Sequence, residues 1–271
     1  MFELEIHYAQ KEKEDKQQIS FIGGKLGLLR KILESLSEIV DHVELKVKEH
    51  GIEMQVMDSM HVVLVDVFLS RALFDKYRCD RDIILGIKIK SLITILKDLT
   101  FPANSLLHIS CNDNPDKMSI CYKQPQYTLN WDLSLYSFDN EVFEIPNIIS
   151  TCEIVMSVQQ FLVLPKLVGI FGEFLSIDAS KDVVIFKQVG DTTSADMTLK
   201  KDGENEVEIN VTEPIKREMA MKYINIISKV ASMSSNVKIQ MGEEIPIFIE
   251  LNIFNLGHLR YFVAPKIDSD N

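Results

Sequence analysis

Four cysteines and six histidines are the residues of this chain best suited to nucleophilic catalysis or metal binding. Cys79 and Cys152 are the candidate nucleophiles of a hydrolase, with one of the histidines as the base. Neither cysteine stands in a nucleophile elbow, and no cluster of histidine and acidic residues has the spacing of a metal site. Asp58 and His61 are close only in sequence. The missing constellation predicts a chain that is not an enzyme and binds no metal or other cofactor.

The sequence also contains no strong signal for phosphate binding or for export. Gly23-Gly24-Lys25 lacks the full spacing of a phosphate-binding loop. The first residues carry acids where a signal peptide carries bases, and no apolar run approaches the roughly 20 residues of a membrane helix. Since the chain is not expected to be exported, the scattered cysteines are predicted to be buried thiols and not disulfides or zinc ligands.

Composition predicts a soluble globular protein with a strong acidic excess. The 271 residues are 46% hydrophobic and 25% charged, and 29 basic residues against 40 acidic ones give a net charge of −11. Taken over the whole chain, this charge argues against a nucleic-acid partner, because phosphate binding depends on cationic contacts. The distribution of the basic residues therefore decides the question.

Four segments have apolar residues at helical spacing and recur at a period of about 64 residues. Ser91 is placed to cap the second segment, and Pro165 should kink or shorten the third. The predicted helices are residues 28–40, 91–99, 157–168 and 221–230.

Between these helices lie strand-like runs, many of which alternate apolar and polar residues. A helix followed by three or four strands, repeated four times, predicts an α+β fold with two similar domains of two repeats each. The expected domains are residues 1–134, with a charged insert near 9–24, and residues 153–271, joined by a connector at 135–152. The predicted strands are 43–47, 53–56, 61–69, 82–89, 106–111, 118–123, 127–135, 183–187, 197–199, 206–211, 237–240 and 245–253.

Three motifs resemble the eukaryotic DNA sliding clamp, the proliferating cell nuclear antigen family. They are Met57-Asp58-Ser59-Met60-His61-Val62, the run from Phe74 to Arg81, and the run from Gly257 to Asp268. Weaker similarity extends through nearly the whole chain and includes Ile145-Pro146 in the connector.

The resemblance implies the DNA-clamp fold and a closed homotrimeric ring whose helices line the central hole. The strands at 127–135 and 191–199 would join neighbouring subunits. Such a ring encircles duplex DNA, without regard to its sequence, as a processivity factor for DNA polymerase. It also serves as a docking platform for a clamp-loader ATPase, a flap endonuclease, a ligase and other replication and repair proteins in the nucleus. The alternative is a subunit of a checkpoint clamp with three different chains.

All four predicted helices carry basic residues on their polar sides, although the chain is strongly acidic. Lysines often do no more than solvate a helix, but these positions match those that line the hole in the family. The residues expected to face DNA are Arg30, Lys31, Lys97, Lys166, Lys222 and Lys229.

The family binds short peptides that carry a glutamine, an aliphatic residue and two aromatic residues. Judged alone, Met57 and Leu64 would be core residues, and His61 a packed neutral histidine. The joint match with the connector and the C-terminal run favours a peptide site. Its predicted residues are Met57, His61, Leu64, Phe143, Ile145, Pro146, Pro246, Phe262, Ala264, Pro265 and Lys266, and Lys181 matches the position that accepts ubiquitin-type modifiers.

Overall fold

The computed structural model describes residues 1–7, 24–100, 102–138, 143–145, 149–201 and 207–266. The described chain divides into two compact units. The first comprises Met1–Val56, Asp66–Val142 and Phe254–Gly257, and the second comprises Met57–Val65, Phe143–Ile253 and His258–Asn271. The charged insert predicted near 9–24 lies almost wholly outside the described residues.

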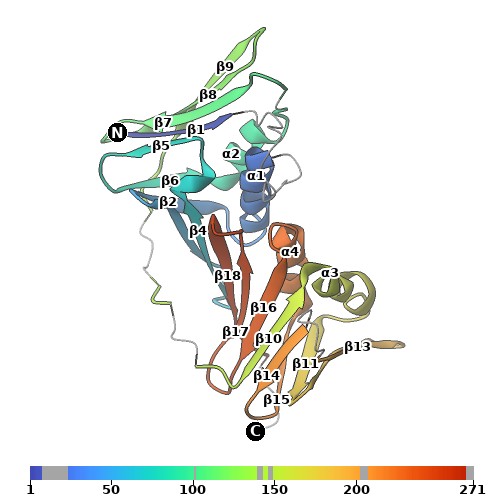
Figure 1. Ribbon diagram of the computed structural model, residues 1–271. Helices are drawn as coiled ribbons and strands as arrows, with labels where there is room; N and C mark the ends of the chain where they lie inside the picture. The colour runs from blue at the N-terminus through green and yellow to red at the C-terminus, as the bar shows by residue number, and fades with distance from the viewer. Residues whose placement is uncertain (8–23, 101, 139–142, 146–148, 202–206, 267–271) are drawn as a thin grey trace. The chain divides into compact units, whose positions relative to one another are not determined.

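The first unit consists of antiparallel strands and two helices that pack side by side (Figure 1). One sheet has the order β5-β1-β7-β8-β9, and the other strands follow the order β4-β3-β2-β6. The elements are β1 (Phe2–His7), α1 (Gly24–Leu36), β2 (His42–Lys48), β3 (Gly51–Met57), β4 (Val63–Ser70), the 3₁₀ turn η1 (Arg71–Leu73), β5 (Lys76–Cys79), β6 (Ile83–Lys88), α2 (Ile89–Leu96), β7 (Leu106–Cys111), β8 (Lys117–Lys123) and β9 (Thr128–Ser134).

The second unit repeats this plan with sheet orders β14-β10-β16-β17-β18 and β13-β12-β11-β15. Its elements are β10 (Cys152–Ser157), α3 (Val158–Phe161), the π-helical turn η2 (Leu164–Val168), β11 (Phe174–Ser180), β12 (Val183–Val189), β13 (Ser194–Lys200), β14 (Val207–Val211), β15 (Ile215–Ala220), α4 (Met221–Ala231), β16 (Asn236–Met241), β17 (Ile247–Asn252) and β18 (Gly257–Val263).

The predicted α+β fold and the fourfold repeat are confirmed, but six strands of the described chain are not among the predicted ones: β1, β5, β10, β11, β15 and β18. A strand also precedes each helix: β1, β6, β10 and β15 come directly before α1, α2, α3 and α4 in the order of elements. Of these four strands, the sequence pattern predicted only β6. Each repeat is therefore a strand, a helix and three or four further strands.

The observed helices confirm the predicted helical periodicity, but some of the predicted helix boundaries are wrong. The prediction for α4 began at the observed residue, and Pro165 does shorten the third helix, because α3 spans four residues before η2 begins. The first helix begins at Gly24 and ends at Leu36, earlier than the predicted 28–40. The proposed cap at Ser91 is wrong, since Lys88 holds the N-cap position of α2 and no side chain caps it.

Alternating burial explains why the strands form two-sided sheets. In β7 and β8 every second side chain is buried, and the buried residues include Leu107, Ile109, Met118, Ile120 and Tyr122. The helices cover such faces with broad apolar stripes. In α4 the stripe contains Tyr223, Ile224, Ile227 and Val230. The polar sides of the helices remain available to solvent.

No helix in the described ranges is both long and apolar enough to cross a membrane.

Candidate functional site

In the first unit, three of the predicted DNA-facing residues lie on or next to the packed pair α1 and α2. Arg30 donates a hydrogen bond from Nη1 to the Lys97 carbonyl oxygen at 2.8 Å, and its Nε lies 3.7 Å from Glu34. Lys97 follows the last residue of α2, and its ammonium is 3.9 Å from Asp98. Lys31 is the third base of this group. Arg30 therefore ties the two helices together and also contributes charge to their polar side.

The second unit places its three predicted bases on η2 and α4, which pack against each other. Lys166 is exposed on η2, and Lys222 and Lys229 are exposed on α4. The Lys222 ammonium lies 4.6 Å from the centroid of the Tyr223 ring, within range of a cation–π interaction. In both units the predicted bases thus belong to the helices and not to the sheets.

Five apolar residues from distant parts of the chain form a cluster in the second unit. Leu64, Phe248 and Phe262 are buried, and Met57 and Phe143 are partly buried against them. Phe248 on β17 pairs with Phe262 on β18, and their ring centroids are 5.1 Å apart. The structure therefore brings together four predicted residues of the peptide site. It adds Phe248, which lies in the predicted strand 245–253 but is not among the predicted residues of the peptide site.

A turn at residues 58–62 adjoins this cluster and is organised by Asp58. The Asp58 carboxylate is buried and accepts hydrogen bonds from the Val62 and Val63 amides at 2.7 and 2.9 Å. His61 has φ of 56° and is exposed. The expected strand at 61–69 therefore begins at Val63, and the reading of His61 as a packed histidine is wrong. The turn instead presents His61 to solvent beside the cluster.

The remaining predicted peptide-site residues differ in accessibility. Ile145 is 46% exposed, and Ala264 is exposed next to half-buried Pro265. The Ala264 amide donates to the Val62 carbonyl at 2.8 Å, which joins the C-terminal segment to the 58–62 turn. Pro246 is half-buried at the start of β17, and Pro146 lies outside the described residues.

Lys266 has contacts of its own that a peptide would have to share. Its amide donates to the Glu218 carbonyl at 2.7 Å, and its ammonium lies 3.5 Å from the Glu218 carboxylate. The same ammonium is 4.6 Å from the centroid of the Phe174 ring. These contacts hold the end of the described chain against β11 and β15.

Two aromatic residues of the connector pack on strands of the first unit. Tyr136 donates its amide to the Gly86 carbonyl at 2.9 Å, and its ring stacks on Phe138. A Cβ atom at Gly86 would lie 2.1 Å from the Tyr136 carbonyl oxygen, so this close approach requires glycine. The connector therefore covers the edge of β6 with Tyr136 and Phe138 and contributes Phe143 to the apolar cluster.

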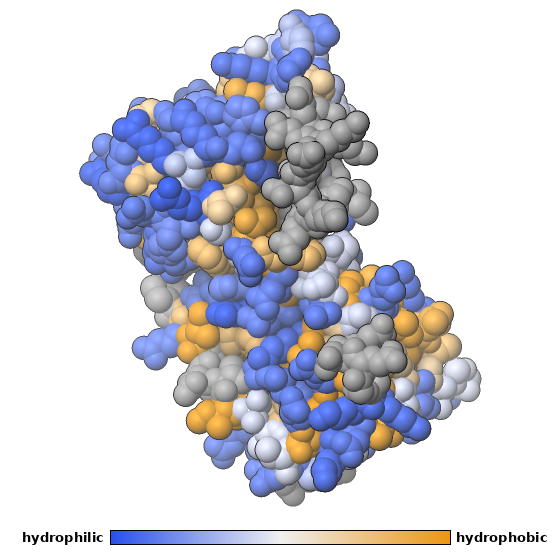
Figure 2. Space-filling model, in the orientation of Figure 1, coloured by the Kyte–Doolittle hydropathy of each residue, from blue (hydrophilic) through white to orange (hydrophobic). Residues whose placement is uncertain are grey.

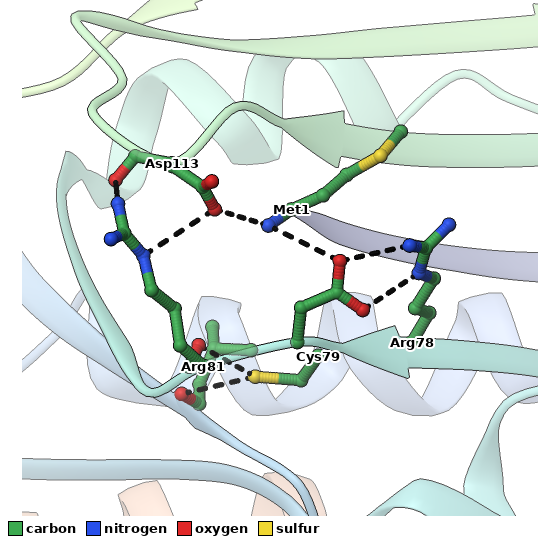
Figure 3. A network of polar contacts seen from close by, with 7 residues as sticks. Met1, Arg78, Cys79, Arg81 and Asp113 are labelled. Carbon is green, nitrogen blue, oxygen red and sulfur yellow. Dashed lines mark hydrogen bonds and ion pairs between the residues drawn. The ribbon is translucent and has the colours of Figure 1, made fainter.

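The candidate nucleophiles do not have the environment of reactive cysteines. Burial raises the pKa of the Cys152 thiol to about 11, and burial also raises the pKa of Cys79. Figure 3 shows Cys79 beside a polar network, in which its Sγ donates to the Arg81 carbonyl at 3.0 Å. The Met1 ammonium pairs with Asp113, and Arg78 pairs with Asp80 at 2.8 Å. Both thiols are held protonated, which is the wrong direction for a nucleophile.

Metal ligands do not gather either. Within the described ranges, no group of three or more histidine, cysteine, aspartate or glutamate residues is placed to hold a metal ion.

Comparisons with known proteins identify the family. The model of the family "Proliferating cell nuclear antigen, N-terminal domain" matches residues 24–143, and that of "Proliferating cell nuclear antigen, C-terminal domain" matches residues 144–266. "Proliferating cell nuclear antigen 2" of Drosophila melanogaster is 32% identical over 243 residues, which cover 89% of this chain and 94% of that protein. The chain belongs to the proliferating cell nuclear antigen family.

Membership of the proliferating cell nuclear antigen family makes the chain a DNA sliding clamp that acts as a processivity factor. Its fold is that of two clamp domains with few helices and many antiparallel strands. The family is a non-catalytic one that binds DNA, further copies of itself and replication proteins. The match over both domains does not favour the checkpoint-clamp alternative.

Proposed function

We propose that three copies of this chain close head to tail into a homotrimeric ring around duplex DNA, with β9 of one subunit pairing with β13 of the next. The observation that carries the proposal is the position of these strands, because each is the last strand of its sheet in the described structure. An unpaired edge leaves a row of backbone donors and acceptors open to another chain. A head-to-tail contact that closes satisfies both edges in every subunit.

Exposed apolar side chains beside both edges support this pairing. Leu167, Ile170 and Val189 are each more than half exposed, and Phe171 is partly exposed. Phe171 lies next to Gly190, just before β13 begins, and η2 packs against β13. Figure 2 shows apolar surface on the side of the second unit where α3 and β13 lie. On the first unit, Tyr127 and Leu129 expose apolar surface at β9. Contiguous exposed apolar surface is typical of a protein interface.

Within the ring, the bases on α1, α2, η2 and α4 would face the DNA phosphates. In a chain of net charge −11, their location on helices favours an electropositive lining inside an acidic molecule. Contacts to the phosphate backbone carry no sequence information, so the clamp would be held by enclosure and slide freely. We place the two domains at residues 1–134 and 153–271, with 135–152 as their connector.

The apolar cluster and the 58–62 turn are proposed as the docking site for partner peptides, together with Ile145, Pro146, Pro246, Ala264, Pro265 and Lys266. The expected partners are a DNA polymerase, the clamp-loader ATPase, a flap endonuclease and a ligase, all in the nucleus. Aromatic and thioether surfaces suit the aromatic anchors of such peptides. Lys181, exposed in the turn between β11 and β12, is a proposed modification site. The protein itself would catalyse no reaction.

Light scattering after size-exclusion chromatography tests the ring. The wild-type chain of 31.0 kDa should elute with three times that mass. The double variant Leu167→Asp, Ile170→Asp should elute as a monomer, because it places charge in the proposed contact. Ile84→Asp is the matched control, since Ile84 is 59% exposed on β6 and should leave the trimer intact. A wild-type monomer, or a trimer that survives the double substitution, would contradict the proposed contact.

A further inference from the structure

Asp58 is a buried carboxylate stabilised by neutral donors. It is 8% exposed, and among the described residues no ammonium or guanidinium forms an ion pair with it. One carboxylate oxygen accepts the Val62 and Val63 amides, and the other accepts the Tyr223 hydroxyl at 2.9 Å. A buried charge of this kind is stable only while its hydrogen bonds are complete. Loss of any one donor therefore has a large effect on the position of this group.

The carboxylate determines the shape of the 58–62 turn. Besides the two amide bonds to Oδ1, the Asp58 amide donates to the Val63 carbonyl at 3.1 Å, and the His61 amide donates to the Asp58 carbonyl at 2.9 Å. These bonds hold His61 in a left-handed conformation that a non-glycine residue rarely adopts. Met57 and Leu64, which bracket the turn, belong to the apolar cluster. Movement of Asp58 would therefore move one wall of the proposed docking site.

Tyr223 connects this carboxylate to α4. Its ring is 2% exposed in the first turn of the helix, and the preceding residue, Lys222, holds its ammonium over that ring. Burial, with the bond to Asp58, raises the pKa of Tyr223, so the hydroxyl remains a donor at neutral pH. The attraction between the Lys222 ammonium and the ring face restrains the ring in the position from which its hydroxyl donates to Asp58.

We propose that Asp58 and Tyr223 are positioning residues for the docking site. The Tyr223 hydroxyl holds the Asp58 carboxylate, the carboxylate holds the 58–62 turn, and the Lys222 ammonium restrains the Tyr223 ring. Peptide affinity then depends on α4, although no residue of α4 lies among the residues expected to contact the peptide. The inference rests on the proposed docking function and adds to it a link to the helix that is proposed to face DNA.

The test is calorimetry with a synthetic peptide that carries a glutamine, an aliphatic residue and two aromatic residues. Tyr223→Phe keeps the ring and removes the hydroxyl. It should lower the peptide affinity by about threefold to tenfold, because only a part of the free-energy cost of removing one donor from a buried charge is expected to reach the docking site. Lys222→Gln should lower the affinity for the same peptide by about twofold, because it removes the cation–π contact with the Tyr223 ring.

Tyr77→Phe is the matched control for a merely structural effect. Tyr77 lies in the other compact unit, and its hydroxyl donates to the Lys48 and Gly51 carbonyls at 2.6 and 2.8 Å. It should lower the melting temperature, as Tyr223→Phe is also expected to do, and leave the peptide affinity unchanged. Lys187→Gln, at an exposed position of β12, is the control for charge.

Wild-type affinity in either Tyr223→Phe or Lys222→Gln, or an equal loss in Tyr77→Phe, would overturn the inference. Failure of the docking proposal gives a different result, because the wild-type chain itself would then bind no such peptide. If the wild type binds the peptide and Ile145→Ala weakens binding, the docking proposal is supported. The variants Tyr223→Phe and Lys222→Gln then test only whether α4 positions the docking site.

Discussion

Ile145→Ala isolates the peptide-binding contribution of one connector residue from the stability of the fold. The substitution removes three side-chain carbons, which are worth about 2.4 kcal/mol if a bound peptide buries them fully from water. Ile145 is 46% exposed, so roughly half of that area is already covered in the free chain. About 1 kcal/mol remains to be gained on binding, and its loss should lower the peptide affinity by about fivefold.

Calorimetry on wild type and variant gives the ratio directly. The part of the side chain already covered in the free chain should lower the free energy of unfolding by about 1 kcal/mol, and thermal unfolding measures that loss separately. Ile149→Ala is the matched control, because Ile149 is 77% exposed and lies outside the proposed site. An Ile145→Ala variant with wild-type affinity, or an equal loss in Ile149→Ala, would refute the assignment of Ile145 to the docking site.

Three further predictions concern the core, the charge pattern and the thiols. Phe262→Ala should lower the free energy of unfolding by about 3–5 kcal/mol, because Phe262 is 4% exposed against Phe248; a loss below about 1 kcal/mol in urea titrations would contradict this packing. Reversing Arg30, Lys31 and Lys229 to Glu should reduce stimulation of a polymerase on a loaded template and leave the trimer intact, whereas reversing the exposed strand residues Lys187 and Lys216 should have little effect; equal losses would argue against a helix-lined hole. Burial raises the pKa of Cys111 and Cys152 from 9.0 to about 11, so each contributes stability that is complete below pH 9 and is lost as the pH rises toward 11. The urea midpoint should fall across that interval, and Cys152→Ala should remove part of the fall; a pH-independent midpoint would count against buried thiols.

Local periodicity predicted those elements whose pattern is unambiguous. The alternation in residues 106–111 gave β7 with its observed bounds, and the stripe of apolar residues gave α4 to within one residue. Of the strands missed before helices, β1 alternates cleanly as Phe-Glu-Leu-Glu-Ile-His, whereas β15 has a weaker pattern. β15 reads Ile-Lys-Arg-Glu-Met-Ala, whose charged centre hides the buried Ile215 and Met219. The start of α1 was missed because glycines at 24 and 27 have low helix propensity, which tertiary packing of Leu26 and Leu28 overrides.

The candidate site was predictable only in part because it is assembled from distant strands. Resemblance to the family marked Met57, Leu64, Phe143 and Phe262, which the structure brings into one cluster. Phe248 joins them through its register with Phe262 across a hairpin, and register is not encoded in alternation alone. The contacts of Lys266 with Phe174 and Glu218 are equally non-local. The oligomeric contact and the peptide site remain predictions for the experiments above.

The residues of the apolar cluster lie far apart in the sequence, and this has a consequence during synthesis. Leu64 leaves the ribosome about 180 residues before Phe248, so at translation rates of roughly 5–20 residues per second it waits on the order of ten seconds or more for its partners. During that interval Met57 and Leu64 lack Phe248 and Phe262, the buried aromatic residues against which they pack in the folded chain. Nascent chains of this protein should therefore be chaperone clients until the last hairpin emerges, and truncation before β17 should yield aggregates and not a stable half-molecule.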